Sequence, residues 1–313
     1  MGPRRHRVGA RQSAQRRVGS GSPEPQRDAR SGRADGALVI RPLVLKFGGE
    51  LLEDSGHLRS VVGAVAQIAS SGRPIVVVHG GGKEIDAALQ RAGIEKRQVD
   101  GLRITDEPTL DVAVSVLAGA VNTRFVAALN AAGVAAVGLT GADGLCGLSV
   151  AAPPHRSVDG RIVDLGRVGV PAADADMRLL QALTRERFIP VIASIGVGDD
   201  GRLFNVNADT FAGHLAAELG AARLVIAGTT PGVLDTAGAT LPALDPETIA
   251  ALIDARTATA GMIAKLRACA DAIAGGVDDI VIVDGRERSD LEAAANGAPR
   301  RATRVARAAA VKR

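Results

Sequence analysis

The sequence predicts an α/β fold in which a mostly parallel sheet is covered by helices on both faces. Short runs of apolar, largely β-branched residues alternate along the chain with amphipathic helical patterns. Strands that are apolar throughout are typical of a sheet buried on both sides. Glycines follow directly after two of these runs. In such sheets ligands bind beyond the carboxyl ends of the strands, so these glycines mark a candidate site.

The first half of the chain contains three expected strands and three expected helices. The strands are LVLKF (43–47), PIVVV (74–78) and AAVGL (135–139). The helices cover 57–71, with Gly72 just past the end, the segment up to Leu89, and 108–132, which Thr105 or Asp106 can cap. The alternating segments 145–151 and 161–170 flank a turn-rich stretch and predict a β-hairpin.

The same alternation continues in the second half. A helix over 174–187 leads into the strand FIPVIASIG (188–196), and GDDG (198–201) predicts a tight turn before LFNVNAD (203–209). There follow a helix over 210–219, the strand RLVIAG (223–228), helices over 246–255 and 259–275, and a last clear strand, DIVIVDG (279–285).

Basic residues gather at the two ends of the chain. Residues 1–36 and 298–313 each carry a net charge of +6, so a total of +4 leaves −8 for the body between them. We interpret 1–36 as a disordered, Arg-rich leader and 298–313 as a basic tail. The body has no basic stripe with interleaved aromatic residues, and the chain has no Tyr or Trp. Specific nucleic-acid binding is therefore not expected.

Other bulk properties favour a cytoplasmic enzyme. With 46% hydrophobic residues among 313, the chain can bury the core of one or two domains. No apolar run reaches the ~18 residues that span a bilayer, and the first forty residues lack the apolar segment of a secretory signal. We interpret Cys146 and Cys269 as buried reduced thiols. The histidines have no metal-ligand spacing, so no metal-binding side chains are predicted.

Two glycine runs, KFGGE (46–50) and HGGGKE (79–84), connect a strand to a following helix. Backbone N–H groups at such a junction, together with the helix dipole, bind anions such as phosphate. Neither run matches the GxxxxGK[ST] or the GxGxxG pattern. The alternative is a tight turn that requires a positive φ, for which one glycine would suffice.

Two lysines are candidates for chemistry on a phosphoryl group. Lys46 lies two residues before the first glycine run, and Lys265 lies in the first turns of the helix after TATAGM. A lysine near a helix N-terminus opposes the dipole, so a local structural gain does not explain it. Two ammonium groups brought together would need an anion between them, such as a transferring phosphoryl group. The alternative is a pair of surface lysines.

Polar residues at other strand ends have more than one interpretation. In NVNAD (205–209) one residue can cap the next helix, but three polar side chains exceed that need. Arg103 is either a solvated loop charge or a bidentate clamp for a carboxylate. His79 ends a strand among apolar neighbours, and we interpret it as a structural histidine rather than a catalytic one.

Taken together, these segments resemble the amino acid kinase family, and within it the branch that acts on N-acetylglutamate. The resemblance extends in order from residue 43 to residue 285. It rests on LVLKFGGELL, VVVHGGGKEID, VDGLRITDEPTLDV, VGLTGADG, FIPVIASIGVGDDGRLFNVNADTFAG, TTPGVL and GMIAKLRACADAIAGGV. The glycine runs with the paired lysines specify the wider family of carboxylate, carbamate and UMP kinases. GLRITD with NVNAD is the narrower mark of the branch.

The resemblance implies a catalytic role for three residues. Lys46 and Lys265 would neutralise the charge on the phosphoryl group in flight, and Asp209 would hold the two lysines in place. No general base would be required, because a side-chain carboxylate with a pKa of ~4.3 is already ionised at neutral pH. ATP with Mg²⁺ would be the donor, and N-acetyl-L-glutamyl 5-phosphate, an intermediate of arginine biosynthesis, would be the product.

The resemblance also implies binding roles for two further sets of residues. Backbone N–H groups of the glycines would bind the nucleotide phosphates and the transferring group, from Gly48 and Gly49 on one loop and Gly81 and Gly82 on the other. Arg103 and Asn205 would grip the α-carboxylate of N-acetylglutamate.

The fold implied by the resemblance is an open three-layer αβα sandwich with a mainly parallel sheet. Residues 37–200 would form an N-terminal lobe that binds the amino acid and makes a homodimer. Residues 201–297 would form a C-terminal lobe that binds ATP. The leader lacks the helical arm that precedes LKFGG in arginine-sensitive hexamers of the family. The implied dimer is therefore expected to be insensitive to arginine.

The sequence departs from the family pattern in three places. Thr229 stands where the family usually has Asp in the loop before Gly-Val-Leu, Ala142 stands where it often has Lys, and the C-terminal segment APRRATRV matches poorly. Two alternatives to this function stay open. One alternative is a related kinase for an aminoadipate derivative in lysine biosynthesis. Another is a catalytically silent regulatory paralogue, which Thr229 favours and which the intact Lys46, Asp209 and Lys265 disfavour.

Overall fold

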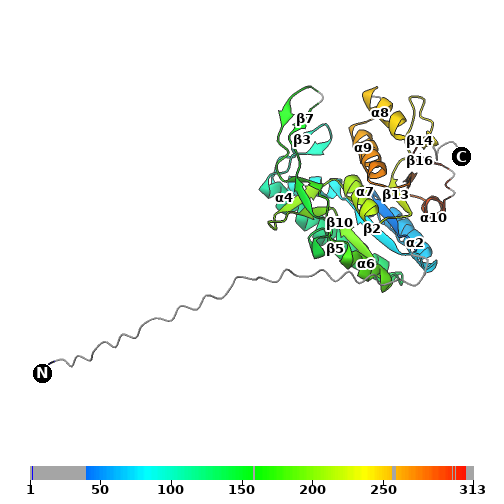
Figure 1. The fold of residues 1–313 in the computed structure, drawn as a ribbon, viewed down its shortest axis with the longest axis horizontal. Helices are drawn as coiled ribbons and strands as arrows, with labels where there is room; N and C mark the ends of the chain where they lie inside the picture. Colours follow the sequence, from blue (N-terminus) through cyan, green and yellow to red (C-terminus); the bar gives the residue numbers. More distant parts are fainter. Residues whose placement is uncertain are drawn as a thin grey trace, which may run out of the picture. The chain divides into compact units, whose positions relative to one another are not determined.

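An eight-stranded sheet forms the centre of the fold in the computed structural model (Figure 1). From one edge to the other its strands are β14 (Ala243–Leu244), β16 (Ala302–Ala306), β15 (Asp279–Asp284), β13 (Arg223–Gly228), β1 (Leu43–Phe47), β2 (Ile75–His79), β10 (Ile189–Ala193) and β5 (Ala136–Thr140). Neighbouring strands are parallel except β15 and β16, which are antiparallel. The prediction of a mostly parallel sheet is confirmed.

The structure describes Gly2 and residues 40–157, 159–255, 259–297, 299 and 301–307. All of its helices and strands belong to one compact unit that begins at Ile40. The leader predicted for residues 1–36 therefore lies, apart from Gly2, outside the described residues.

Side chains alternate along the strands and fill two separate cores, one on each face of the sheet. Leu43, Leu45 and Phe47 of β1 belong to the first core, and Val44 belongs to the second. Helices α2 (Ser55–Ser70), α5 (Asn122–Ala131) and α10 (Arg288–Asn296) bury side chains in the first core. Helices α6 (Arg178–Arg185), α7 (Ala208–Glu218), α8 (Pro246–Asp254) and α9 (Ala260–Ala274) do so in the second. The predicted three-layer αβα sandwich is thus confirmed.

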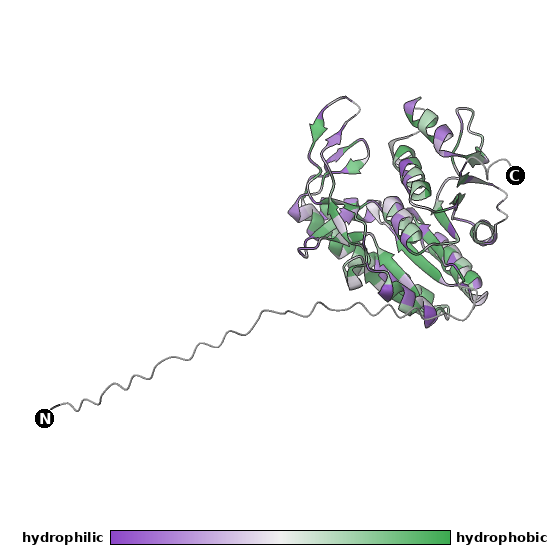
Figure 2. Ribbon diagram, in the orientation of Figure 1, coloured by the Kyte–Doolittle hydropathy of each residue, from purple (hydrophilic) through white to green (hydrophobic). Residues whose placement is uncertain are grey.

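Hydropathy follows these layers (Figure 2). The strands of the large sheet are hydrophobic almost throughout, whereas the covering helices alternate between hydrophobic and hydrophilic residues. All five residues of β1 are buried, and so are all five of β2. Alternation along β1 places the side chain of Lys46 on the same face as Val44, toward α7 and α9.

The predicted β-hairpin forms, as part of smaller sheets beside the large one. β6 (Ser149–Ala151) pairs antiparallel with β9 (Val168–Pro171), and nearer the tip β7 (His155–Arg156) pairs antiparallel with β8 (Ile162–Val163). β9 continues into a four-stranded sheet with β12 (Leu203–Val206) and β11 (Ile195–Val197). A separate ribbon is made by β3 (Gln98–Val99) and β4 (Leu102–Arg103).

The remaining helices begin close to strand ends. α1 (Glu50–Glu53) follows β1, and α3 (Gly82–Ala92) follows β2. α2 begins two residues before the predicted position, because Asp54 Oδ1 accepts hydrogen bonds from the backbone N–H groups of Gly56 and His57 at 2.8 Å each. A short 3₁₀-helix, η2, covers Asp143–Leu145.

The helix predicted over 108–132 is continuous but not uniform. It consists of α4 (Glu107–Val114), a π-helical stretch η1 (Ser115–Val121) and α5. Among the described residues it is the one helix that is long and apolar enough to cross a membrane, by length and composition alone. Its buried side chains Leu117, Phe125 and Leu129 pack into the first core, which accounts for an apolar composition in a helix that lies against a sheet.

Two expectations about strands are wrong. Residues 188–196 do not form one strand, because the chain leaves the large sheet at Ser194 and β11 pairs antiparallel with β12 instead. Residues 279–285 are not the last strand. α10 follows, and β16 inserts between β14 and β15 with Val305 fully buried. Residues 302–306 therefore belong to the sheet rather than to a basic tail.

Candidate active site

The two glycine loops lie side by side at the carboxyl ends of adjacent strands. The register of β1 and β2 pairs Lys46 with Val78 and Phe47 with His79, so both strands end at the same level. The Gly80 N–H donates a hydrogen bond to the Phe47 carbonyl oxygen at 3.3 Å, which ties one loop to the other. The site predicted at this edge of the sheet therefore has two loops that come together directly.

Glycine is required in these loops for close approach rather than for backbone conformation. None of the five glycines has a positive φ, so the alternative of a turn that needs one is wrong. A Cβ on Gly49 would lie 2.6 Å from the Cα of Gly81, and a Cβ on Gly81 would lie 2.8 Å from Leu117 Cδ2. A Cβ on Gly82 would meet nothing within 4 Å. Gly82 thus faces open space, whereas Gly49 and Gly81 pack against protein atoms.

Several backbone N–H groups of the loops point to no protein acceptor. Within the described part of the chain, those of Gly49, Gly81 and Gly82 donate no hydrogen bond, whereas the Gly48 N–H donates to the Ala227 carbonyl oxygen at 3.0 Å. α3 has no side-chain cap at its N-terminus, where Gly81 is the N-cap residue. The site thus offers unpaired donors at a helix N-terminus, the arrangement that binds phosphates.

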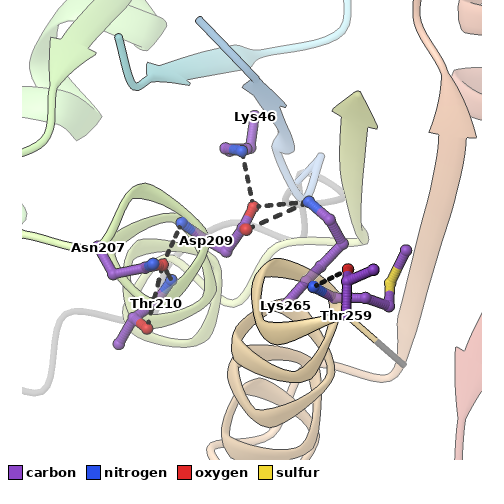
Figure 3. A network of polar contacts seen from close by, with 7 residues as sticks. Lys46, Asn207, Asp209, Thr210, Thr259 and Lys265 are labelled. Atoms are coloured by element: carbon purple, nitrogen blue, oxygen red, sulfur yellow. Dashed lines mark hydrogen bonds and ion pairs between the residues drawn. The ribbon is translucent and has the colours of Figure 1, made fainter. Parts of the chain in front are cut away.

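Asp209 joins the two candidate lysines (Figure 3). Its Oδ1 lies 2.8 Å from Lys46 Nζ, and its two carboxylate oxygens lie 3.3 and 3.2 Å from Lys265 Nζ. Each residue comes from a different element: Lys46 from β1, Asp209 from the first turn of α7 and Lys265 from α9. The alternative of two surface lysines is wrong, because only 8% of the Lys46 side chain and 14% of the Lys265 side chain are exposed.

Helix caps hold these elements in place. Asn207 is the N-cap of α7, and its Oδ1 accepts hydrogen bonds from the backbone N–H groups of Asp209 and Thr210 at 2.9 and 3.1 Å. Thr259 caps α9 by accepting from the Met262 N–H at 3.4 Å. Of the three polar residues in NVNAD, Asn207 therefore serves as the cap, which leaves Asn205 and Asp209 for the cavity.

The electrostatics of this group favour an anion. Burial would raise the pKa of Asp209, but Lys265 and Lys46 outweigh it and hold that pKa well below its usual range. Burial lowers the pKa of Lys46; Asp209 opposes this change, and Lys265 adds to it. With both lysines protonated, two positive charges share the Asp209 carboxylate, and Glu50 in the cavity lining adds a weaker attraction on Lys46. The two ammonium groups are buried near unpaired N–H donors, and together these groups attract an anion.

A cavity of about 290 Å³ brings most of the predicted residues together. Those that line it are Lys46, Gly48, Gly49, Gly81, Gly82, Arg103, Asn205 and Asp209. Lys265 is not among the residues that line it, but its Nζ lies 3.2 Å from the lining residue Asp209. Glu50, Ser194 and Leu117 also line it and were not predicted. Glu50 could have been predicted to line the cavity, because it directly follows the glycine pair in the sequence. No sequence pattern indicates that Ser194 and Leu117 line it.

Arg103 is anchored rather than solvated, and 9% of its side chain is exposed. Its Nη2 donates to Asp86 Oδ1 at 2.6 Å and to the Gly82 carbonyl oxygen at 3.2 Å. Lys96 Nζ holds the other oxygen of Asp86 at 2.6 Å. The Arg103 Nη1 is buried and has no hydrogen-bond partner among the described residues. A buried guanidinium nitrogen without a partner is costly, and a carboxylate ligand in the cavity would satisfy it.

Asn205 lies on β12 and also lines the cavity. Its Nδ2 donates to Thr105 Oγ1 at 3.2 Å, which orients the side-chain amide. Thr105 is fully buried and belongs to the predicted GLRITD segment. This contact joins GLRITD to NVNAD, the two segments that mark the acetylglutamate branch in the sequence.

Comparisons with known proteins place this chain in a family. A model of the amino acid kinase family matches residues 41–284. Acetylglutamate kinase of Brucella abortus (strain S19) is 42% identical over 250 residues, which cover 78% of this chain and 83% of that protein. Acetylglutamate kinase of Rhizorhabdus wittichii is 43% identical over 247 residues, covering 78% and 82%. The structure of Giardia carbamate kinase shares the fold, with a TM-score of 0.63 at 15% identity, covering 86% of this chain and 99% of that one.

Proposed function

Because the chain belongs to the amino acid kinase family, we propose that it performs its reaction in the cavity between the glycine loops and Asp209. The chain transfers a phosphoryl group from ATP to the side-chain carboxylate of N-acetyl-L-glutamate; the relatives with 42–43% identity are named acetylglutamate kinase. The predicted function thus agrees with the comparisons, and neither relative points to an aminoadipate derivative. The observation that carries the assignment of the cavity is the Lys46–Asp209–Lys265 cluster beside unpaired N–H groups.

In the proposed mechanism a carboxylate oxygen of the substrate attacks the γ-phosphorus, the bond to the bridging oxygen of ADP breaks, and the acyl phosphate forms. The barrier is the repulsion between two anions. Lys46 and Lys265 lower it by neutralising charge on the transferring group, and Asp209 keeps both ammonium groups in position. N–H groups of Gly49, Gly81 and Gly82 bind the phosphate oxygens. The Gly48 N–H, for which the same role was predicted, donates to the Ala227 carbonyl oxygen instead. The substrate carboxylate is already ionised, so no side chain removes a proton.

The substrate is held by two side chains that line the same cavity, those of Arg103 and Asn205. Arg103 Nη1, buried and without a partner among the described residues, binds the α-carboxylate of N-acetylglutamate together with the Asn205 amide. Asp86 holds the guanidinium through its other terminal nitrogen, Nη2. The N-terminal lobe, residues 37–200, then supplies most of the amino-acid site, to which Asn205 contributes from just beyond the boundary, and residues 201–297 bind ATP. The boundary is compatible with the sheet, whose halves meet where β1 pairs with β13.

Mg²⁺ accompanies ATP in this proposal. No group of three or more His, Cys, Asp or Glu side chains that could hold a metal occurs among the described residues. The Asp209 carboxylate is occupied by the two lysines. The donor set therefore fits a cation bound mainly by the ATP phosphates and water, as Mg²⁺ commonly is. When bound, it would neutralise charge on those phosphates.

Trapping of the acyl phosphate with hydroxylamine tests the proposal. The unchanged chain with ATP, Mg²⁺ and N-acetyl-L-glutamate should form the hydroxamate, and the corresponding aminoadipate derivative should react less well, by the ~1–3 kcal/mol that one methylene is worth. Lys265→Ala should lower kcat by a factor of about 10²–10³, since it removes one donor to the transferring group. Arg267→Ala, an exposed position on the same helix, should leave kcat unchanged. Full activity in Lys265→Ala would refute the assigned role.

We further propose that the protein acts as a homodimer in the cytoplasm and that arginine does not regulate it. This part rests on the family resemblance alone. Light scattering with and without arginine should give the mass of a dimer in both cases. An arginine-bound hexamer would contradict this part of the proposal and leave the assigned reaction intact.

A further inference from the structure

His79 is fully buried behind the second glycine loop and makes two polar contacts. Its Nδ1 lies 3.1 Å from the Gly80 carbonyl oxygen, and its Nε2 lies 3.0 Å from the side-chain Nδ2 of Asn122. The ring packs edge-on against Phe125. His79 does not line the cavity, so these contacts act on the loop from the side opposite to the ligand.

The contacts determine the protonation state of the ring. Asn122 Nδ2 also donates to the Val191 carbonyl oxygen at 2.9 Å, so the NH₂ group must face both acceptors. A flipped amide would place two oxygens against each other. His79 Nε2 therefore accepts, and its Nδ1 carries the proton and donates to Gly80. Burial is consistent with a neutral ring, because it lowers the pKa of His79 to about 4.

Asn122 is itself held in place by features far apart in the sequence. It is the first residue of α5, directly after the π-helical stretch η1. Such stretches shift the register of a helix and occur often at functional sites. Gly138 of the edge strand β5 makes the space for Asn122: a Cβ there would lie 2.1 Å from Asn122 Oδ1. The side-chain amide of Asn122 is thus positioned jointly by η1, β5 and β10.

The hydrogen bond from His79 determines where the next N–H points. The described chain has no cis peptide bond, and in a trans peptide the carbonyl and the following N–H point in opposite directions. Because His79 draws the Gly80 carbonyl toward the protein interior, the Gly81 N–H is directed to the other side, where Gly81 lines the cavity. That N–H donates no hydrogen bond within the described residues.

We propose that His79, held by Asn122, is a positioning residue that aims the Gly81 N–H at the transferring phosphoryl group. The inference rests on the proposed function for the identity of the anion. In addition to that function, it assigns His79 the role of supporting the glycine loop. His79 transfers no proton in this role. The sequence favours a structural histidine at this position. The contacts of His79 connect this structural role to the reaction, because they orient a loop of the active site.

A spectroscopic experiment tests the geometry without turnover. A long-range ¹H–¹⁵N spectrum of the full chain at pH 7 should show His79 protonated at Nδ1 and unprotonated at Nε2. On addition of AMP-PNP with Mg²⁺, the amide signal of Gly81 should shift in the unchanged chain and shift much less in His79→Leu. The opposite tautomer, a doubly protonated ring, or an equal Gly81 shift in both chains would overturn the inference.

Kinetics separate positioning from simple packing. His79→Leu should lower kcat about 10- to 100-fold with a smaller change in KM, since an aimed donor matters most in the transition state. His79→Asn keeps a nitrogen donor near the position of Nδ1 and should recover at least a tenfold part of that loss. Val191→Ala trims the same core but leaves the Val191 carbonyl, so it should lower the Tm without lowering kcat.

Two outcomes have distinct meanings. If His79→Leu lowers the Tm but keeps the kcat of the unchanged chain, the residue is merely structural and the inference fails. If the unchanged chain forms no acyl phosphate, the proposed function fails, and the tautomer and the Gly81 signal still decide whether His79 positions the loop.

Discussion

Asp209 lies between two lysines that are far apart in the chain, and its environment shows why the residue types matter. A lysine offers a compact ammonium group on a flexible stem, whereas an arginine would present a planar fork. Lys46 and Lys265 are two of only five lysines in a chain with 33 arginines. Two ammonium groups can lie within 3.3 Å of the same carboxylate and still leave protons to donate to a phosphate.

Replacement of Asp209 should reveal the cost of burying Lys46. The pKa of Lys46 is already below its ordinary value, and Asp209→Asn removes the attraction that opposes this change. The free energy of unfolding should then fall by roughly 3–5 kcal/mol at neutral pH, the usual effect of breaking a buried ion pair. Between the folded and unfolded pKa values of Lys46 the unfolded chain binds the extra proton, so stability recovers as the pH rises toward 10.

Urea denaturation of Asp209→Asn at pH 7 and pH 9.5 checks this expectation. The deficit relative to the unchanged chain should be smaller at the higher pH. Adding Lys46→Met should restore part of the lost stability at pH 7, since it removes the uncompensated charge. A deficit that is independent of pH and unaffected by the second substitution would mean that Asp209 matters for packing alone.

The two glycine loops act as one unit because they contact each other. Gly49 lets the two backbones approach, Gly81 leaves room for the side chain of Leu117, and the hydrogen bond from the Gly80 N–H to the Phe47 carbonyl oxygen fixes the contact. Gly82, one residue further on, faces open space. Neighbouring glycines in one pattern thus serve different purposes, and substitution by alanine can tell them apart.

Gly49→Ala and Gly82→Ala form a matched pair for this test. Gly49→Ala should destabilise the protein by about 1–3 kcal/mol, since its Cβ would meet backbone rather than a flexible side chain. Gly82→Ala should change stability by less than about 0.5 kcal/mol, because its Cβ meets no protein atom. It should nevertheless raise KM for ATP or acetylglutamate by narrowing the cavity.

Thermal denaturation with kinetics on both variants distinguishes these effects. If Gly82→Ala binds both substrates as tightly as the unchanged chain, the open space beside Gly82 is not where a ligand lies. If Gly49→Ala is as stable as the unchanged chain, the loops can separate without cost, and their contact does not hold the site together.

The sheet extends to the C-terminal end of the described chain. β16 lies between β14 and β15, with Thr303, Val305 and Ala306 fully buried. Thr303 Oγ1 accepts from the Val233 N–H at 2.8 Å and donates to the Leu241 carbonyl oxygen at 2.6 Å. These contacts tie the last strand to the loop that follows β13, so the second half of the sheet depends on residues after 297.

Truncation measures how much β16 contributes. The free energy of unfolding of a chain that ends at Gly297 should be lower by more than the ~1.5–3 kcal/mol that burial of one valine side chain supplies, because the strand pairing is lost as well. A chain that ends at Arg307 retains β16 and should keep the stability of the full chain. Equal urea midpoints for the two truncated chains would contradict the placement of this strand.

The sequence alone determined the pattern of strands and helices, since apolar runs and amphipathic periods depend on neighbours along the chain. It also indicated the residue types of the site: glycines and Lys46 near strand ends, and Asp209 and Lys265 near the starts of two helices. Only the tertiary structure decided that Asp209 bridges both lysines, that Gly49 touches Gly81, that Arg103 is anchored by Asp86 and that β16 joins the sheet. Each of these contacts joins residues separated by tens to hundreds of positions, and a local pattern carries no information about such a partner. β16 was missed because its charged neighbours hid a strand of only five residues.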